Sequence, residues 1–219
     1  VLLLVNMGVI GLAYMLFFLA GQIPAPRGRV AIDADMAEQQ KIVNRQALGI
    51  AVLLTPSLLL GFTFVTMMAA LHQTSPSSRK AVSQAALAFA TMYATLVTLV
   101  YFVQLTLVGP RMSAGDMAEI EFLRFVPYRS FLFAVDLLGY SFMSLATLFG
   151  ALALPDIPSA RAPRIFMLAT GILLPAIALQ MYFPQLIWIA ALWGLTFPAA
   201  AFFIAAMFAG LQVPFAIDR

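Results

Sequence analysis

The longest uncharged stretch of the chain is the feature that most constrains its fold. Residues 165–217, 53 in a row, include no Asp, Glu, Lys or Arg. As one α-helix this stretch would be about 80 Å long, far more than the roughly 30 Å of hydrocarbon in a bilayer. It must therefore fold back on itself. We expect the break at MYFPQ, because Pro184 cannot continue the helical hydrogen bonds.

Most of the remaining chain is also apolar and uncharged. Residues 1–26, 46–78 and 81–110 contain no Asp, Glu, Lys or Arg. The whole chain is 63% hydrophobic and 10% charged, whereas soluble domains are about half apolar and a quarter charged. No soluble core could bury so much apolar surface, so membrane-spanning helices are the direct explanation.

These stretches predict an all-α, polytopic integral membrane bundle that forms a single transmembrane domain over residues 1–219. A helix needs roughly 20 residues to cross a bilayer, and about six segments reach or approach this length. We place the spans at residues 2–20, 47–71, 81–108, 130–154, 165–182 and 185–211. The lipid bilayer is then the first expected partner of the chain.

The opening segment, VLLLVNMGVIGLAYMLFFLA, has no basic region and no small-residue cleavage site. We therefore interpret it as a span and not as a signal peptide. Because residue 1 is Val, we expect that further sequence precedes it. Lys and Arg divide seven against five between the two sides, which is too even to set the orientation. We expect a multi-pass protein of a bacterial inner (plasma) membrane.

Two polar loops predict short helices outside the spans. The segment DADMAEQQKIVNRQ predicts a surface helix capped by Asp33 or Asp35. In SAGDMAEIEFLRF, Ser113 can cap a helix, and three apolar residues there share one face: Met117, Ile120 and Leu123. This second pattern predicts an amphipathic helix that lies on the lipid headgroups, although a plain helical linker would show the same pattern.

Several classes of chemistry lack the residues that they need. The chain has no cysteine and only one histidine, His72, so thiolate ligands and paired histidine ligands are absent. Lys41 and Lys80 both lie in predicted loops, which leaves no intramembrane lysine for a Schiff base. There is no glycine-rich phosphate loop, and the net charge of +3 forms no basic patch. We predict no enzyme, no catalytic residues, no metal, no cofactor and no nucleic-acid partner.

A six-residue motif occurs on three of the predicted spans. It reads LLGFTF at residues 59–64, LLGYSF at 137–142 and LWGLTF at 192–197. Glycine followed two residues later by Ser or Thr thins a helix and offers a hydroxyl for bonding across a helix interface. The motif therefore predicts close packing of these three helices.

A second regularity has an offset of 81 residues. YFVQL begins at Tyr101 and YFPQL at Tyr182, while SSRKA begins at Ser77 and PSARA at Pro158. Two matches at one offset favour a duplicated helical hairpin, with the second and third spans repeated as the fourth and fifth. Chance is the alternative, because a composition so rich in apolar residues produces coincidences readily.

One carboxyl side chain lies inside a predicted span, in the stretch SFLFAVDLLGYSF. An isolated Asp at a span centre costs about 2.5–3.5 kcal/mol, so Asp136 should be paired or should face a wet cavity. Tyr140 lies one turn further on the same helix face, and Arg129 lies two turns back. Counting along the antiparallel preceding span brings Tyr101 and Gln104 level with the acid. We predict that these five residues form a ligand-binding cluster.

Asp136 has a functional and a structural interpretation. In the functional one it is a proton or cation site, or a polar anchor in a small-molecule pocket. In the structural one it is a hydrogen-bonded residue that only fixes how two spans pack. It stands just before its copy of the motif, where the other copies have Leu58 and Ala191. Our leading hypothesis is a bundle that binds or transports a small molecule or ion. The alternative is an accessory or scaffolding subunit of a larger membrane protein complex.

Overall fold

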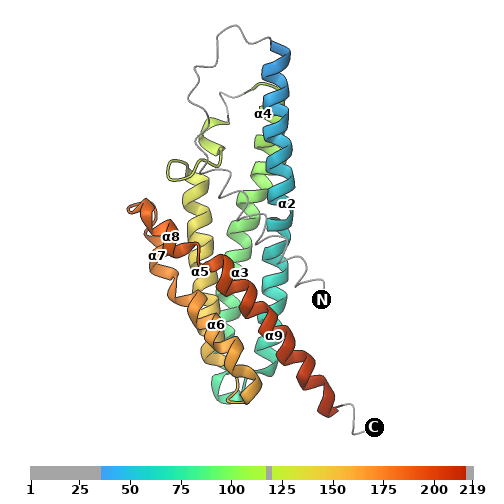
Figure 1. Ribbon diagram of the computed structural model, residues 1–219, viewed down its shortest axis with the longest axis vertical. Coiled ribbons are helices and arrows are strands. Elements are labelled where there is room, and N and C mark those ends of the chain that lie inside the picture. Colours follow the sequence, from blue (N-terminus) through green and yellow to red (C-terminus); the bar gives the residue numbers. More distant parts are fainter. Residues whose placement is uncertain (1–35, 117–119, 216–219) are drawn as a thin grey trace.

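The computed structural model describes residues 36–116 and 120–215, and every regular element in these ranges is a helix (Figure 1). Five helical segments are long and apolar enough to cross a membrane. They are Ser57–Thr74, Ser77–Ser113, Phe131–Ala153, Pro158–Ala178 and Pro184–Gly210. The described residues thus confirm the prediction of an all-helical fold with several helices long and apolar enough to cross a membrane. The first predicted span, residues 2–20, lies outside the described residues.

The first described helix, α2 (Met36–Thr74), is a single helix of 39 residues, about 58 Å long. It joins the polar segment that follows Asp35 to the second predicted span without a break, where we expected two separate elements. The reason is that residues 36–48 contain no Pro or Gly and are rich in Ala, Glu, Gln and Lys, which favour a helix. The predicted caps, Asp33 and Asp35, lie outside the described residues.

Three long helices pack together in one group (Figure 1). The middle helix, α3 (Lys80–Val103), follows the turn η1 (Ser77–Arg79) and runs antiparallel to α2. It packs against both α2 and α5 (Phe131–Ala153). Helix α5 begins at a capping residue, because the Ser130 Oγ accepts a hydrogen bond of 3.2 Å from the Phe133 backbone N–H.

Two of the three motif glycines allow α3 to approach its neighbours closely. A Cβ on Gly61 would lie 3.3 Å from the Ala94 Cα, and a Cβ on Gly139 would lie 2.8 Å from the Val97 Cγ2. A Cβ on Gly194 would meet nothing within 4 Å. The prediction of close packing at the motif glycine is therefore confirmed for the copies on α2 and α5, and it is wrong for the copy on α9.

The C-terminal end of α3 widens into a π-helix, η2 (Gln104–Val108), before α4 (Gly109–Ser113). The Gly109 backbone N–H bonds to the Gln104 carbonyl five residues earlier. Pro110 explains the wide turn, since proline has no N–H and its ring clashes with the carbonyl four residues before it.

The predicted amphipathic helix after Ser113 does not form in the described part of this loop. Ser113 is the last residue of α4, and its hydroxyl donates a 3.1 Å hydrogen bond to the Gly109 carbonyl. Gly115 then adopts a φ of 80°, which ends the helix. After residues 117–119, which are not described, the 3-10 turn η3 (Glu121–Leu123) is the one helical element in the described part of the loop before α5.

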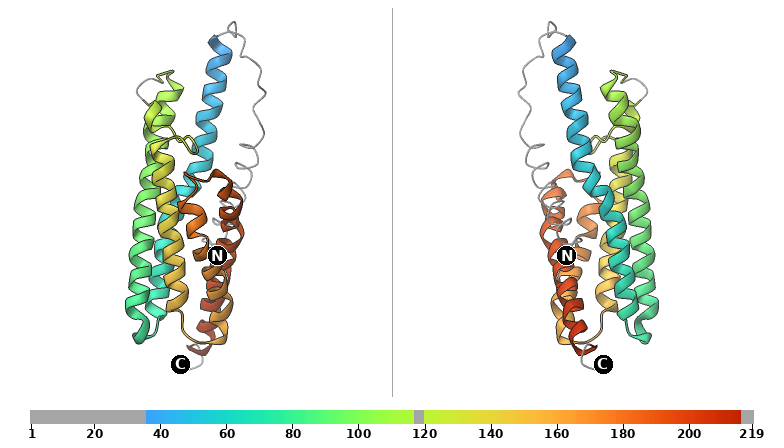
Figure 2. Two further views of the ribbon diagram at one scale, coloured as in Figure 1. Left: turned by 90° about the vertical axis from the view of Figure 1, so that its left-hand side faces the viewer. Right: turned by 90° about the vertical axis from the view of Figure 1, so that its right-hand side faces the viewer.

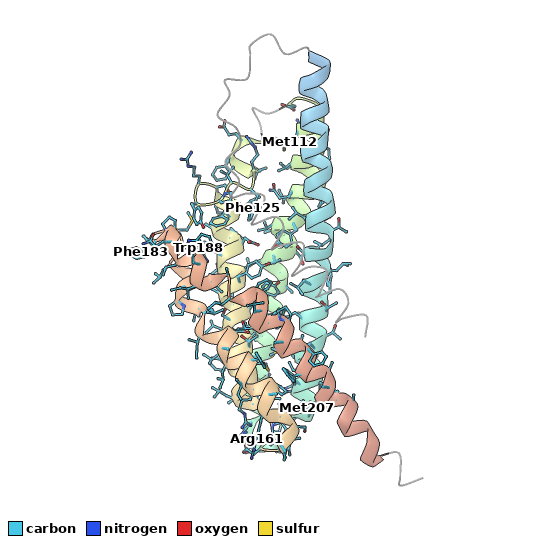
Figure 3. The ribbon with its side chains drawn as sticks, viewed as in Figure 1. Met112, Phe125, Arg161, Phe183, Trp188 and Met207 are labelled. Carbon is cyan, nitrogen blue, oxygen red and sulfur yellow. The ribbon has the colours of Figure 1, made fainter. Side chains whose placement is uncertain are left out.

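The remaining helices form a second group beside the first, with α6 and α9 side by side (Figure 2). Its elements are η4 (Pro158–Ala160), α6 (Arg161–Ile172), α7 (Leu174–Ala178), η5 (Pro184–Leu186), α8 (Ile187–Ala190) and α9 (Trp193–Phe215). The long uncharged stretch folds back at Pro184, as predicted. Figure 3 shows Phe183 and Trp188 at the tip of this hairpin, and both are exposed.

The offset of 81 residues recurs in local structure. The turns η1 and η4 begin at Ser77 and Pro158, and the helices after them begin at Lys80 and Arg161. The likeness ends further along, because α6 stops before Pro175, whereas the corresponding part of α3 continues as one helix. The duplicated hairpin stays a prediction.

An ion-pair cluster joins η1 to the residues on either side of η4. The Asp156 carboxylate pairs with the guanidinium groups of both Arg79 and Arg164, with 2.9 Å between the Arg164 Nη2 and the Asp156 Oδ1. Hydrogen bonds from Arg79 and then from Arg164 hold the pKa of Asp156 below its usual range. Both arginines also donate to the Leu154 carbonyl, at 2.5 and 2.8 Å, and so cap the C-terminal end of α5.

Candidate functional site

Asp136 is buried in the second turn of α5, with 6% of its surface exposed. The Tyr101 hydroxyl of α3 lies within hydrogen-bonding reach of its carboxyl group. Its Oδ1 atom has no hydrogen-bond partner among the described residues. The structure therefore brings Asp136 and Tyr101 together, as the count along the antiparallel helices predicts.

Tyr140 extends this contact. Its hydroxyl oxygen lies 3.0 Å from the hydroxyl oxygen of Tyr101. Either tyrosine hydroxyl can donate in this contact. The contact brings Tyr140 to the side chains of Tyr101 and Asp136, and we call these three residues the acid-tyrosine cluster.

Tyr140 also belongs to a closed circle of five aromatic side chains. Its ring centroid lies 5.5 Å from that of Tyr93 and 5.3 Å from that of Trp193. Trp193 stacks on Phe197 at 5.4 Å, and Phe64 closes the circle with 5.4 Å to both Phe197 and Tyr93. We call these five residues the aromatic circle. It connects α2, α3, α5 and α9, so four helices support the acid-tyrosine cluster.

The sequence analysis did not include the other members of the aromatic circle among the site residues. A signal for two of them exists, because Phe64 and Phe197 are the last residues of their motif copies. The copy on α5 ends in Phe142, which instead stacks on Phe89 at 6.1 Å. The motif therefore marks a contact between α2 and α9 that does not extend to α5.

Gln104 is buried, but its hydrogen bonds serve the loop before α5 and not Asp136. Its Nε2 donates to the Leu123 carbonyl at 2.6 Å, and its Oε1 accepts from the Phe125 backbone N–H at 3.1 Å. Phe125, which is labelled in Figure 3, packs on Phe133 near the start of α5. Gln104 therefore holds the loop in place, and its hydrogen bonds do not bring it into the acid-tyrosine cluster.

Arg129 is exposed and lies two residues before Phe131, the first residue of α5. The hydroxyl within hydrogen-bonding reach of the Asp136 carboxyl is that of Tyr101. Of the five predicted ligand-binding residues, three therefore come together, and Gln104 and Arg129 have other positions.

The motif hydroxyls bond across helices in one copy only. The Thr196 hydroxyl oxygen of α9 lies 3.0 Å from that of Thr170 in α6. Thr63 and Ser141 instead donate to carbonyls of their own helices. Ser144, which follows the motif on α5, is fully buried, and its Oγ has no hydrogen-bond partner among the described residues.

The acid-tyrosine cluster offers one carboxyl group and two neutral hydroxyls. Among the described residues, no three His, Cys, Asp or Glu side chains lie close enough to hold a metal ion together. Hard divalent cations such as Ca²⁺ take six to eight oxygen ligands. The donor set therefore fits a proton or a singly charged ligand better than a divalent metal.

Fold and site together define a class: an all-helical protein with five helices long and apolar enough to cross a membrane, one of which carries a buried acid. Comparison with protein-family models, curated proteins and solved structures finds no match to this chain.

Proposed function

We propose that the chain is a non-enzymatic membrane protein that binds or transports a small molecule or ion through the acid-tyrosine cluster. One observation carries the proposal: the carboxyl of Asp136 is buried, and its Oδ1 has no hydrogen-bond partner in the described ranges. A buried polar group without a partner requires an explanation in a native structure, and a ligand supplies one.

A purely structural role for Asp136 explains the site less well. An acid that only joins two helices is expected to use both carboxyl oxygens, whereas the Oδ1 of Asp136 has no hydrogen-bond partner among the described residues. Helices α3 and α5 already approach closely where Gly139 meets Val97. Packing therefore does not require an acid at this position.

The proposal includes three finer predictions. We propose six spans, with residues 2–20 as the first, in the inner membrane of a bacterium. We also propose that the hairpin of α2 and α3 is duplicated in α5 and α6. Five helices of suitable length and composition support the first prediction, and the matching turns at Ser77 and Pro158 support the duplication.

Thermal unfolding of the purified chain in detergent tests the proposed site. A ligand that binds only the folded state at 100 times its Kd adds about 2.7 kcal/mol of stability. We expect protons, a monovalent cation or a small organic amine to raise the Tm of the wild type, and Asp136→Asn to abolish that rise. Ser141→Ala is the matched control, because this hydroxyl on the same helix donates to the Leu137 carbonyl. Equal ligand responses in the wild type and Asp136→Asn would refute the proposal.

Gentle detergent extraction separates this function from the alternative, an accessory or scaffolding subunit of a larger membrane protein complex. A monodisperse chain whose ligand response depends on Asp136 supports the binding function. Co-purification of a stoichiometric membrane protein that is lost in Asp136→Asn, with no ligand response, supports the subunit.

A further inference from the structure

Positive charge gathers at the end of the bundle where the turns η1 and η4 lie, next to Arg161 in Figure 3. The two segments that form this end, residues 73–85 and 150–165, contain one acidic residue, Asp156. They contain four basic residues: Arg79, Lys80, Arg161 and Arg164. Four positive charges and one negative charge leave these two segments with a net charge of +3.

Three of the four basic side chains bond to other groups of the protein. The Lys80 ammonium donates to two carbonyls in the last turn of α2. Arg79 and Arg164 cap the C-terminal end of α5 and share the Asp156 carboxylate. Because two guanidinium groups face one carboxylate, the acid does not cancel the positive charge of this end.

Arg161 is the exception, and the repeated turn explains it. Lys80 and Arg161 are the first residues of α3 and α6 and lie 81 residues apart. Lys80 caps the helix before its own turn, whereas the helix before η4 is already capped by Arg79 and Arg164. Arg161 is exposed and has no hydrogen bond or ion pair with any residue that the structure describes. The first turn of α6 contains no acid, so the positive end of the helix dipole adds to this charge.

We propose that Arg161 binds the phosphate of an anionic phospholipid headgroup. This inference rests on the membrane location in the proposed function, but it does not involve Asp136. Four of the candidate membrane-spanning segments begin or end at this end of the bundle, at Thr74, Ser77, Ala153 and Pro158. In a bilayer, this end therefore lies at the level of the headgroups. A guanidinium presents its N–H groups as a planar fork that binds two phosphate oxygens at once.

Arg164 extends the site. It lies three residues after Arg161 on the same face of α6, and the hydrogen bonds that it donates to described residues all start at Nη2. Its other guanidinium nitrogens are left for a second contact with the phosphate. An exposed ion pair in water is weak, so these groups would hold a free phosphate ion poorly. A lipid phosphate is already confined to the headgroup layer, and an anionic leaflet attracts basic residues near its surface.

Native mass spectrometry of the detergent-purified chain, titrated with phosphatidylglycerol, measures the apparent Kd of the first bound lipid. We expect the wild type to bind this lipid about fivefold or more tightly than phosphatidylcholine, which has the phosphate but no net charge. Arg161→Gln should weaken the binding of phosphatidylglycerol by about fivefold, the effect of one basic residue at an anionic surface. Arg161→Lys keeps the charge and loses the planar fork, so its Kd should lie between those of the wild type and Arg161→Gln.

Arg129→Gln is the matched control, because it removes an exposed arginine just before the opposite end of α5. It should leave the Kd for phosphatidylglycerol unchanged. Inorganic phosphate is the control for a free anion, and it should not displace the lipid. Circular dichroism verifies that each variant is folded, and Arg161→Lys carries the test if Arg161→Gln does not fold.

The outcomes separate this site from the proposed function. Equal weakening in Arg161→Gln and Arg129→Gln, or wild-type affinity in both variants of Arg161, overturns the site. Displacement of the lipid by inorganic phosphate overturns the lipid as ligand. Arg161→Gln should keep the ligand-induced rise in Tm that tests Asp136, so either proposal can fail alone. If the chain does not float with vesicles of phosphatidylglycerol and phosphatidylcholine, the membrane location is wrong and both proposals fail.

Discussion

Gly139 and Gly194 occupy the same position of the repeated motif but have different surroundings in the structure. They therefore test whether helix packing determines the need for glycine at this position. A Cβ on Gly139 would lie 2.8 Å from the Val97 Cγ2 and 3.6 Å from the Leu96 Cβ. A Cβ on Gly194 would meet nothing within 4 Å. The same change, Gly to Ala, should therefore have opposite effects in α5 and α9.

The magnitudes follow from two terms. In a helix interior, where Gly139 lies, Ala is about 1 kcal/mol more favourable than Gly, and the gain is smaller at Gly194, the second residue of α9. Overpacking a tight contact costs about 1–3 kcal/mol, and only Gly139→Ala has this cost. Val97 is fully buried and β-branched, so it cannot rotate away and α3 and α5 must separate slightly. We expect Gly194→Ala to be up to about 1 kcal/mol more stable than the wild type, and Gly139→Ala to be less stable by up to about 2 kcal/mol.

Reversible unfolding in mixed micelles, followed by circular dichroism as the fraction of denaturing detergent rises, measures both changes against the wild type. The informative quantity is the difference between the two variants, about 1–3 kcal/mol from the overpacking term. If both variants shift the midpoint in the same direction by the same amount, the contact with Val97 does not set the role of Gly139, and the reasoning is wrong.

Other expectations use the same unfolding assay or simple extensions of it. Gly171→Ala should destabilise by about 1–3 kcal/mol, because its Cβ would lie 2.7 Å from the Leu148 Cβ and 3.1 Å from its backbone N, which cannot move aside alone; a neutral result would contradict this. Ser144→Ala should stabilise by about 1 kcal/mol, since it removes a buried hydroxyl without a partner among the described residues; a loss of stability would contradict this. Gln104→Leu should speed hydrogen exchange in the loop before α5, whose backbone the amide holds, and unchanged exchange would remove that role. The pKa of Asp156 is lowered in the folded state, so its pairs stabilise the fold above the ordinary value of 3.8 and lose that effect as the pH falls through the folded pKa; Asp156→Asn should lack this loss on the acid side.

The positions of the five long apolar helices could be predicted because a bilayer imposes a requirement on each segment by itself. A long uncharged run must be helical, and Pro184 must interrupt it, whatever its neighbours are. The pairing of Asp136 with Tyr101 and Tyr140 also follows from local rules. Tyr140 is one turn away on the same helix, and Tyr101 is reached by counting along an antiparallel neighbour.

The role of Gln104 and the members of the aromatic circle depend on how distant segments meet. Gln104 bonds to a loop whose path is set by Gly115 and by the packing of Phe125, and no periodicity encodes such a path. Phe64 and Phe197 meet because the second helix group lies beside the first. The continuity of α2 was missed for a different reason: the composition changes from polar to apolar while the backbone preference stays helical.

The aromatic circle is closed, and its closure gives the bundle redundancy. Tyr140 reaches Phe197 by two independent routes, directly through Trp193 or through Tyr93 and Phe64. Loss of any one ring turns the circle into an open chain that still connects the other four side chains. Only a second loss at a non-adjacent member divides them into two sets. Because Tyr140 is the member that α5 contributes, the helix that carries Asp136 stays connected through a single loss at any of the other four rings, whereas an open arrangement would be divided by the loss of an inner ring.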